Sequence, residues 1–575
     1  ALNYPIGAIN PRAPLFDWSA VIFGMLLAPF FGGNQLLAAA YVLSFLPAFW
    51  GAANIFPVYA ITRETFGKKS ALLAAFFIMI MEAQIERSMV TFANYLPFYL
   101  FMILLVVFFY IKTIKLATTR RYVDSYRKIR SIFGGLKTYI SANQRCVLYA
   151  LMFGISFGVS SLAWQGFTFI LAIIVIYFLI QLVINHIRKI DSFGLYISTV
   201  ISMGAGFLLA FPYYYGQRLI PYWFDIPFYI FIAVVILGGI IVILRDVPWM
   251  LLFPIIATVI LIGGAILYVV SPDRFESMIT GQGYFIKTKV YSTVAEAQAP
   301  DFSRIVLSYG IALYFLGFIG VGWTLYQTFK TRRQDYLLLG SWGIVSLYLS
   351  VTAGKFTFVA SPVMAVFSGL IISRYLNWSN FKGLYQSFIG LRATPLYAIR
   401  KSVKPRHVIA VLFIVFIVLF PNVYYGLDGA IPYEAKRKYD KDVYNFLAPL
   451  YKPPTDYDPV NGSIWYLGAY GYSVPTKQSY YPDAYRWLSR QDTNLPVNQR
   501  PAFLSWWDYG FEAVDTGKHP TVADNFQNGF QLAGNALLSQ NESEVIALFI
   551  IRLIDGYRQE NGDISSQIRV TLTSY

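Results

Sequence analysis

The sequence has few of the residues that build disulfides and histidine-based metal sites. Its 575 residues include one cysteine, Cys146, and three histidines, at positions 186, 407 and 519. A single thiol excludes disulfides within the chain and any cysteine-based zinc site, and three histidines make a histidine metal site improbable. A metal would have to be held by carboxylates, which suits Mg²⁺ or Mn²⁺.

Charge is also scarce. Asp, Glu, Lys and Arg make up 13% of the chain, whereas hydrophobic residues make up 57%, and the mean hydropathy is +0.51. Soluble domains carry about 25% charged residues. The composition therefore excludes a set of soluble domains and indicates an integral membrane protein. The chain starts at Ala1 in a polar stretch with no leading apolar span, so we expect further sequence before it.

Apolar runs long enough to cross a bilayer recur as far as about residue 425. The run Trp18–Phe31 is too short for a span and is expected to be an interfacial helix. The sequence predicts twelve spans, at 36–61, 70–86, 95–113, 147–163, 165–187, 194–212, 226–244, 249–270, 304–328, 336–352, 356–375 and 407–425.

Basic residues separate into alternate loops and so predict the orientation of the chain. Before residue 426 one set of loops carries 25 Lys and Arg, nine of them between Lys112 and Arg145, and the opposite set carries eight. The richer set is expected to face the cytoplasm. The net charge of +16 is then mostly cytoplasmic loop charge, and no nucleic-acid partner is expected.

The composition changes after residue 426, where Pro, Tyr, Asp and Asn become frequent and no spanning run follows. We expect three regions: residues 1–35 as the end of an external loop with the interfacial helix, 36–425 as the transmembrane domain, and 426–575 as an extracellular domain. Short helical stretches at 439–449, 481–490 and 541–555 alternate with turns, which predicts a mixed α/β fold for this last region.

Candidate chemical groups collect on the external side. Glu296 lies in a long polar loop, Lys355 lies at the mouth of a span, and Trp506-Trp507-Asp508-Tyr509-Gly510 lies in the external domain. Taken alone, Glu296 is more often a solvated loop acid and Lys355 more often a lysine that reaches the membrane interface. Two adjacent tryptophans beside an acid and a glycine are rarer, although they could simply pack a strand end.

This pentapeptide resembles the signature of the oligosaccharyltransferase catalytic subunits, most closely the archaeal single-subunit enzymes. The similarity extends over nearly the whole chain. Further matching segments are Tyr4-Pro5-Ile6-Gly7, Ala163-Trp164-Gln165-Gly166, Thr293-Val294-Ala295-Glu296, Lys355-Phe356 with Ser361-Pro362-Val363-Met364, and His519 through Gln527. The resemblance implies a polytopic α-helical membrane fold of the GT-C type, with thirteen spans, and a C-terminal external domain. Twelve of those spans fall within this chain.

The resemblance also implies an activity, namely metal-dependent, inverting transfer of an oligosaccharide from a dolichyl phosphate or diphosphate carrier to Asn in Asn-X-Ser/Thr. Glu296 would be catalytic and a possible metal ligand, and Lys355 would contact the lipid phosphate. Trp506, Trp507 and Asp508 would hold the Ser or Thr hydroxyl of the acceptor. The cofactor would be Mn²⁺ or Mg²⁺, and the partners would be the lipid-linked oligosaccharide, the acceptor polypeptide and membrane lipids.

Two departures from the family pattern concern the metal. The family's first catalytic acid precedes the segment at Tyr4, so the chain begins after it. In the second external loop the family has an acid pair, where this chain has Asn94 and Leu96. Asn94 can offer an amide oxygen without charge; alternatively, Glu86 supplies the charge. A second peptide-binding motif of the family is not recognisable before Tyr575.

Three other functions stay open on the sequence. One is a related polyprenyl-phosphate-sugar glycosyltransferase with another acceptor, which the Trp-rich motif disfavours. A second is a transporter, supported only by the number of spans. The third is a non-catalytic paralogue that binds substrate, which Asn94 suggests.

Overall fold

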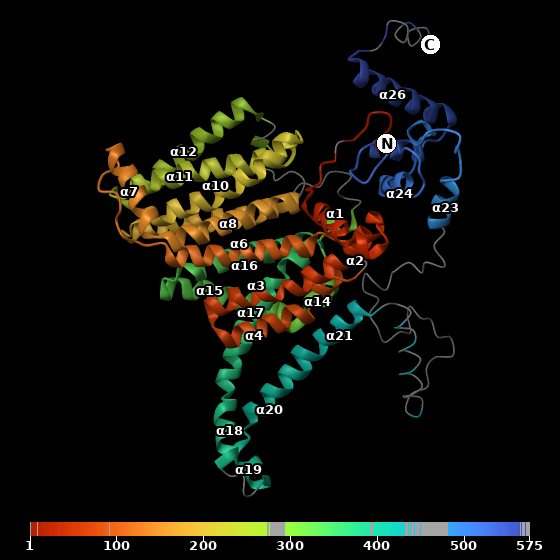
Figure 1. The fold of residues 1–575 in the computed structure, drawn as a ribbon. Helices are drawn as coiled ribbons and strands as arrows, with labels where there is room; N and C mark the ends of the chain where they lie inside the picture. Colours follow the sequence, from red (N-terminus) through yellow and green to blue (C-terminus); the bar gives the residue numbers. More distant parts are fainter. Residues whose placement is uncertain are drawn as a thin grey trace. The chain divides into compact units, whose positions relative to one another are not determined.

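The computed structural model describes residues 2–8, 10–90, 93–272, 275–276, 294–390, 395–431 and 481–563, with a few isolated positions besides. The chain forms two compact units (Figure 1). The membrane unit comprises the described parts of Ala13–Lys287 and Val294–Gly471. The C-terminal unit combines the described parts of Ala1–Arg12 and Tyr472–Tyr575.

Helices are the regular structure of the membrane unit within its described residues, and ten helical segments are long and apolar enough to cross a membrane. They are α2 with α3 (Gln35–Ala53, Ile55–Phe66), α6 (Leu96–Leu116), α8 (Gln144–Ala163), η2 with α9 (Gln165–Phe167, Thr168–Ile187), α10 (Phe193–Gly216), α11 (Asp225–Ile243), α12 (Trp249–Val270), α15 (Ile311–Thr331), α17 with α18 (Phe356–Ser379, Phe381–Gly390) and α20, η6 and α21 (Pro405–Leu412, Phe413–Leu419, Phe420–Ala430).

The remaining helices of this unit are shorter or more polar. They are α1 (Leu15–Leu27), η1 (Ala28–Phe31), α4 (Lys68–Ile80), α5 (Glu82–Arg87), α7 (Ile129–Ala142), η3 (Ile220–Phe224), η5 (Ala295–Ala297), α14 (Phe302–Tyr309), α16 (Gln334–Thr352) and α19 (Pro395–Ser402).

The ten candidate spans overlap ten of the twelve predicted ranges, although the range 304–328 is divided at Gly310 and its span begins only at Ile311. The range 70–86 is helical but breaks at Met81, whose backbone is extended (φ −78°, ψ 123°), so that α4 and α5 are separate. The range 336–352 is found as α16. Its polar residues, among them Asp335, make it less apolar than the ten candidate spans. The helix expected at Trp18–Phe31 is found as α1 and η1, which end at Gly32 in a left-handed conformation; its interfacial position stays a prediction.

Helix α17 is the centre of the membrane unit. Its spanning window is 94% buried, and it packs against α4, α15 and α16. Because α17 is surrounded by other helices and not by lipid, its N-terminus gives a fixed position to the residues that precede it. Lys355 is the residue immediately before α17.

Helices α8 and α10 pack closely through small residues. Gly154 and Gly158 form a small-xxx-small pair on α8, and a Cβ at Gly158 would lie 2.9 Å from the carbonyl oxygen of Gly206 on α10. Such pairs allow helix backbones to approach one another where the hydrophobic effect contributes little. They explain the close packing of α8 against α10, and α6 lies on the other side of α8 (Figure 1).

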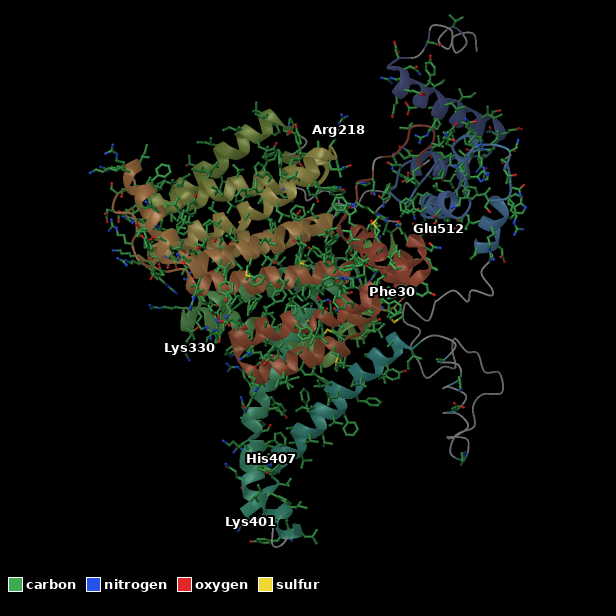
Figure 2. All side chains as sticks on the ribbon, viewed as in Figure 1. Phe30, Arg218, Lys330, Lys401, His407 and Glu512 are labelled. Carbon is green, nitrogen blue, oxygen red and sulfur yellow. The ribbon has the colours of Figure 1, made fainter. Side chains whose placement is uncertain are left out.

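Two labelled residues illustrate the charge pattern of the loops. Lys330, from the richer set of loops, and Arg218, from the poorer set, lie toward opposite ends of the helical bundle (Figure 2). This is the separation that the alternation of basic residues predicts. Together with the ten apolar helices, it describes a multi-pass membrane protein.

The described part of the C-terminal unit consists of short helices and turns, followed by the 20-residue helix α26. Its elements are α23 (Tyr481–Leu488), η7 (Val497–Gln499), η8 (Trp507–Tyr509), α24 (Gly510–Asp515), α25 (Phe530–Leu538) and α26 (Glu542–Asn561). The helices predicted at 481–490 and 541–555 are present, whereas 439–449 lies almost wholly outside the described residues. The described β structure is one parallel bridge between Phe503 and Thr521, so the mixed α/β fold stays a prediction.

The first residues of the chain belong to the C-terminal unit. The N–H of Tyr4 donates to the carbonyl of Thr521 (2.8 Å). Arg552 of α26 donates to the carbonyls of Asn3 and Tyr4 (both 3.1 Å) and to the side chain of Asn3. A segment near residue 4 therefore helps to build a unit that is otherwise formed by residues beyond 480.

Candidate functional site

Glu296 lies in the single turn η5, and its backbone is fixed by the residues before α17. The N–H of Lys355 donates to the carbonyl of Glu296 (2.9 Å), and that of Gly354 donates to the carbonyl of Gln298 (2.8 Å). These two bonds join a loop residue to the buried central helix. They hold the Cα of Glu296 in place while half of its side chain, 49%, remains exposed.

The carboxylate of Glu296 faces Arg87, the last residue of α5. Oε2 of Glu296 lies 3.6 Å from the guanidinium of Arg87, whose side chain is 18% exposed. The break at Met81 produces this contact, because it ends α4 and starts α5 as a separate helix. The sequence analysis gave Arg87 no role.

A second ion-pair cluster fixes α5 against α14. Arg304 of α14 lies 3.4 Å from Oε1 of Glu82 and also pairs with the carboxylate of Glu86. The side chains of Glu82 and Glu86 are 1% and 7% exposed. One turn of helix separates them, so both face the same side of α5. The carboxylate of Glu86 is thus neutralised by Arg304.

Lys355 is half-buried beside its neighbouring ring. Its Nζ lies 5.8 Å from the centroid of the Phe356 ring. Burial lowers the pKa of Lys355 below its ordinary value of 10.5, and the nearby charge of Glu296 partly offsets this effect. A partly desolvated ammonium interacts more strongly with an anion than one in bulk water.

A series of aromatic contacts connects Lys355 to the second external loop. Phe356 lies 6.4 Å from Trp164, and Trp164 lies 6.4 Å from Tyr95 and 4.7 Å from Tyr99. Trp164 belongs to the Ala163–Gly166 segment. Asn94 precedes Tyr95, and its Oδ1 accepts the N–H of Leu96 at the start of α6 (2.9 Å).

These residues offer little to a divalent metal. Within the described ranges, no three His, Cys, Asp or Glu side chains lie close enough together to hold a metal ion. Glu296 is paired with a cation, and the Oδ1 of Asn94 already accepts a backbone hydrogen bond. The described residues thus do not form a metal site on their own, and an expected Mn²⁺ or Mg²⁺ would need further ligands.

The Trp-rich motif lies in the C-terminal unit, with Trp506 leading into η8 and Gly510 starting α24. The side chain of Trp507 is buried, and within the described part of the chain no acceptor lies in hydrogen-bonding range of its indole N–H. Partial desolvation raises the pKa of Asp508 above 3.8, and a hydrogen bond from the Trp506 side chain opposes the shift. The turn therefore places a buried donor without a described acceptor, on Trp507, next to the exposed carboxylate of Asp508.

Gly510 is required by the close approach of a second segment. A Cβ at Gly510 would overlap the carbonyl oxygen of Ala523 and lie 2.7 Å from Cα of Asp524. The motif thus packs directly on the segment His519–Asn525, which the sequence analysis singled out as part of the same resemblance. His519 itself is buried and structural, since its Nδ1 lies 2.7 Å from the carbonyl oxygen of Gly517.

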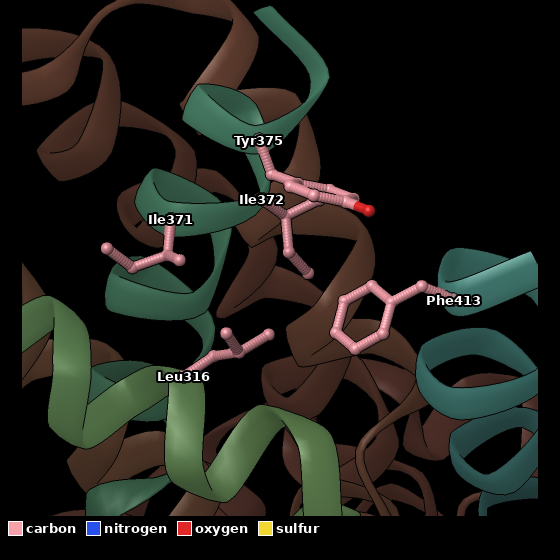
Figure 3. Close-up of a pocket in the computed structure, with 5 residues that line it drawn as sticks. All are labelled: Leu316, Ile371, Ile372, Tyr375 and Phe413. Atoms are coloured by element: carbon pink, nitrogen blue, oxygen red, sulfur yellow. The ribbon is translucent and has the colours of Figure 1, made fainter. Parts of the chain in front are cut away.

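An apolar cavity in the membrane unit is distinct from these groups. It has a volume of about 240 Å³ and lies between α15, α17 and η6 (Figure 3). No charged side chain lines it, so it offers nothing to orient a polar substrate. Its lining residues are Leu316, Ile371, Ile372, Tyr375 and Phe413.

A sequence model of the family "Oligosaccharyl transferase STT3, N-terminal" matches residues 14–425, which is more than two thirds of the chain. The chain belongs to the STT3 family. The matched range contains Glu296, Lys355 and the helices that position them. The Trp-rich motif lies beyond it.

Curated relatives and solved structures agree with membership of the STT3 family. Dolichyl-phosphooligosaccharide-protein glycotransferase 3 of Archaeoglobus fulgidus is 24% identical over 553 residues, covering 92% of this chain and 58% of the relative. Dolichyl-phosphooligosaccharide-protein glycotransferase 1 of Pyrococcus furiosus is 27% identical over 256 residues, covering 39% of this chain and 25% of the relative.

The fold matches a crystal structure of the Archaeoglobus fulgidus oligosaccharyltransferase in the apo form with a TM-score of 0.69 at 19% identity, covering 95% of this chain and 61% of that one. Archaeal oligosaccharyltransferase AglB from the same organism, in complex with an inhibitory peptide and a dolichol-phosphate, matches with a TM-score of 0.68 at 18% identity, covering 96% and 61%. The STT3 chain described here spans about three fifths of the length of these relatives.

Proposed function

We propose that this STT3 chain transfers an oligosaccharide from a dolichyl phosphate or diphosphate carrier to the Asn side chain of Asn-X-Ser/Thr. The observation that carries the proposal is the pairing of the Glu296 turn with the Lys355 turn at the end of the central helix. It fixes the carboxylate of Glu296 and the half-buried ammonium of Lys355 at the start of the same helix. The names of the archaeal relatives agree with the activity.

The acceptor nitrogen is a poor nucleophile because its lone pair is delocalised into the amide carbonyl. In the proposed step, Glu296 accepts a hydrogen bond from the amide N–H and takes its proton, which weakens that delocalisation. The nitrogen attacks the anomeric carbon, a new C–N bond forms, and the C–O bond to the lipid phosphate breaks. A single displacement of this kind inverts the anomeric configuration.

The leaving phosphate gains negative charge as the C–O bond breaks. Lys355 is proposed to stabilise that charge as an ammonium that is already partly desolvated. Arg87, which pairs with the carboxylate of Glu296, supplies a second cation nearby. A bound Mn²⁺ or Mg²⁺ would supply Lewis-acid stabilisation of the same phosphate, with Glu296 and Asn94 as the ligands offered from this chain.

Acceptor choice is proposed to rest on Trp506, Trp507 and Asp508. A Ser or Thr hydroxyl can donate to Asp508 and accept from an indole N–H, and the N–H of Trp507 has no described acceptor. A peptide with Ala leaves both groups unsatisfied. Polar groups left unpaired in this way give stronger discrimination than an apolar pocket can. The motif and Glu296 are proposed to act outside the cytoplasm.

The test is transfer by the full-length protein. It is incubated with archaeal lipid-linked oligosaccharide and a fluorescent Asn-X-Thr peptide, with and without Mn²⁺, and the glycopeptide is quantified. Product that depends on both substrates supports the proposal. Equal product with an Asn-X-Ala peptide would exclude the sequon pocket, and transfer to another acceptor would favour a different glycosyltransferase.

A non-catalytic paralogue that binds substrate is the second candidate, and Asn94 favours it. The residue has no charge and its oxygen is engaged by the N–H of Leu96. Such a paralogue should bind the Asn-X-Thr peptide and yet form no glycopeptide at any Mn²⁺ concentration. In an active enzyme, Asn94→Asp should keep or increase turnover and strengthen its dependence on Mn²⁺.

A further inference from the structure

The backbone around Asp508 is held by one side chain from outside the motif. Nδ2 of Asn525 donates to the carbonyl of Asp508 (2.7 Å), and Oδ1 of Asn525 accepts the N–H of Phe511 (2.9 Å). The N–H of Phe511 is one of the amides at the start of α24 that has no partner within the helix. The Asn525 amide thus hydrogen-bonds to the backbone of both η8 and α24.

Asn525 is fixed independently of the motif. The carboxylate of Asp524 is fully buried and accepts the N–H of Phe526 (2.8 Å) and the Nδ2 of Asn528 (3.2 and 3.3 Å). These bonds form a compact turn that presents the Asn525 amide toward Asp508. The turn can therefore act as a rigid support for the motif.

Aromatic rings cover this junction. Phe511 and Phe526 follow Gly510 and Asn525 in sequence, and their ring centroids lie 5.0 Å apart in an edge-to-face arrangement. The guanidinium of Arg12 lies over both rings, at 5.0 and 5.2 Å from their centroids. Two aromatic contacts with one guanidinium hold the two segments together.

We propose that Asn525 is a positioning residue for Asp508, which it aims at the Ser or Thr hydroxyl of the acceptor. This inference rests on the proposed function. The fork formed by Asn525 needs one donor and one acceptor on the same planar group, which an amide supplies and a carboxylate does not. An aspartate at this position would keep the bond to Phe511 and place an oxygen against the carbonyl of Asp508.

The effect should appear in acceptor selection and not in the chemical step. Asn525 does not touch the reacting atoms, so its loss leaves the groups around Glu296 unchanged. Asn525→Asp should raise KM for an Asn-X-Thr peptide at least about fivefold, the equivalent of one hydrogen bond. It should leave kcat at saturating peptide within about twofold and reduce the Thr-to-Ala preference.

The experiment compares Asn525→Asp, Asn525→Ala and Asn528→Ala in the full-length protein, with Asp508→Ala alongside. Asn528→Ala removes bonds to Asp524 in the same turn but leaves the bonds to Asp508 and Phe511 in place. The readouts are kcat and KM for Asn-X-Thr and Asn-X-Ala peptides, thermal unfolding, and amide hydrogen exchange of a peptide covering residues 506–513.

The inference is supported if both Asn525 variants speed exchange at Phe511 and reduce the Thr-to-Ala ratio, while Asn528→Ala preserves the ratio at a similar melting temperature. It is overturned if Asp508→Ala reduces the ratio and the Asn525 variants do not, or if Asn528→Ala reduces it equally. If neither Asp508→Ala nor Asn525→Asp changes the ratio, the sequon pocket itself fails. Unchanged exchange at Phe511 overturns the positioning role even in a protein that shows no transfer.

Discussion

Glu296 and Arg87 form an ion pair across 3.6 Å, although 209 positions separate them in the sequence. The pair joins the end of α5 to the turn that precedes α14. In the proposed reaction, Glu296 accepts a hydrogen bond from the amide N–H of the acceptor while Arg87 compensates the charge of the carboxylate. The arrangement leads to the following predictions.

Glu296→Gln should lower turnover on the order of 10²-fold or more, because preorganised charged groups at a reacting centre typically contribute that much. The KM for the acceptor peptide should change little, since the carboxylate acts on the amide during reaction and contributes little to capture. Steady-state transfer assays measure both, with Glu542→Gln on exposed α26 as the control. Near-normal turnover in the variant would remove Glu296 from the site.

Arg304→Ala should mainly lower stability, whereas Arg87→Ala should mainly lower turnover. Arg304→Ala leaves the buried carboxylates of Glu82 and Glu86 without that partner, and loss of a buried partner costs about 3–5 kcal/mol. Arg87→Ala leaves a half-exposed Glu296, so its cost in stability should be about 1 kcal/mol or less, while turnover falls. Thermal unfolding in detergent and transfer assays on both variants provide the comparison, and equal melting temperatures would contradict it.

Turnover should fall at alkaline pH through Lys355. Burial lowers its folded-state pKa below 10.5, so the ammonium is lost as the pH rises through that lowered value. Because the folded state binds this proton less tightly than the unfolded state, the free energy of unfolding decreases as the pH falls from 10.5 through the folded-state pKa. Lys355→Arg should keep its charge to higher pH, and Lys355→Met should lose turnover without losing thermal stability. If the pH–rate profile of Lys355→Arg is identical to that of the wild type, deprotonation of Lys355 does not cause the loss of turnover at alkaline pH.

Selection for Thr over Ala at the acceptor should weaken at acid pH. The pKa of Asp508 is raised above 3.8, chiefly by desolvation, so protonation begins at a higher pH than for a fully solvated aspartate. The ionised form accepts the hydroxyl proton, and the Thr-to-Ala ratio should therefore fall as the pH drops through the raised pKa. Asp508→Asn should show a small Thr-to-Ala ratio that does not change with pH. A wild-type ratio that is constant down to pH 4 would argue against Asp508 as the acceptor.

The orientation of the chain can be tested with cysteine labelling, because Cys146 is the chain's one thiol and is buried. A cysteine at Gln540 should react with a membrane-impermeant maleimide in intact cells, and one at Lys128 should react only after permeabilisation. The basis is the bias of Lys and Arg toward one set of loops. The reverse pattern would place the C-terminal unit in the cytoplasm.

Hydropathy and basic loops were sufficient to predict the helical membrane fold, because length and polarity act locally along the chain. The break at Met81 was missed although polar residues follow it at once, at Glu82, Gln84 and Glu86, because the whole range 70–86 was read as one span. The roles of Arg87 and Arg304 were missed because each pairs with carboxylates more than 200 positions away. Asn525 lay within a segment that the resemblance matched, yet only the fold shows which backbone groups its amide meets.

The participation of residues 3, 4 and 12 in the C-terminal unit has a consequence for biogenesis. These residues are synthesised more than 500 positions before their partners Thr521, Phe526 and Arg552. Chains are synthesised at about 5–20 residues per second, so the early segment waits at least about half a minute before its partners exist. The C-terminal unit can therefore form only after Arg552 has been synthesised, and a nascent chain stalled before residue 521 carries an early segment whose partners are missing.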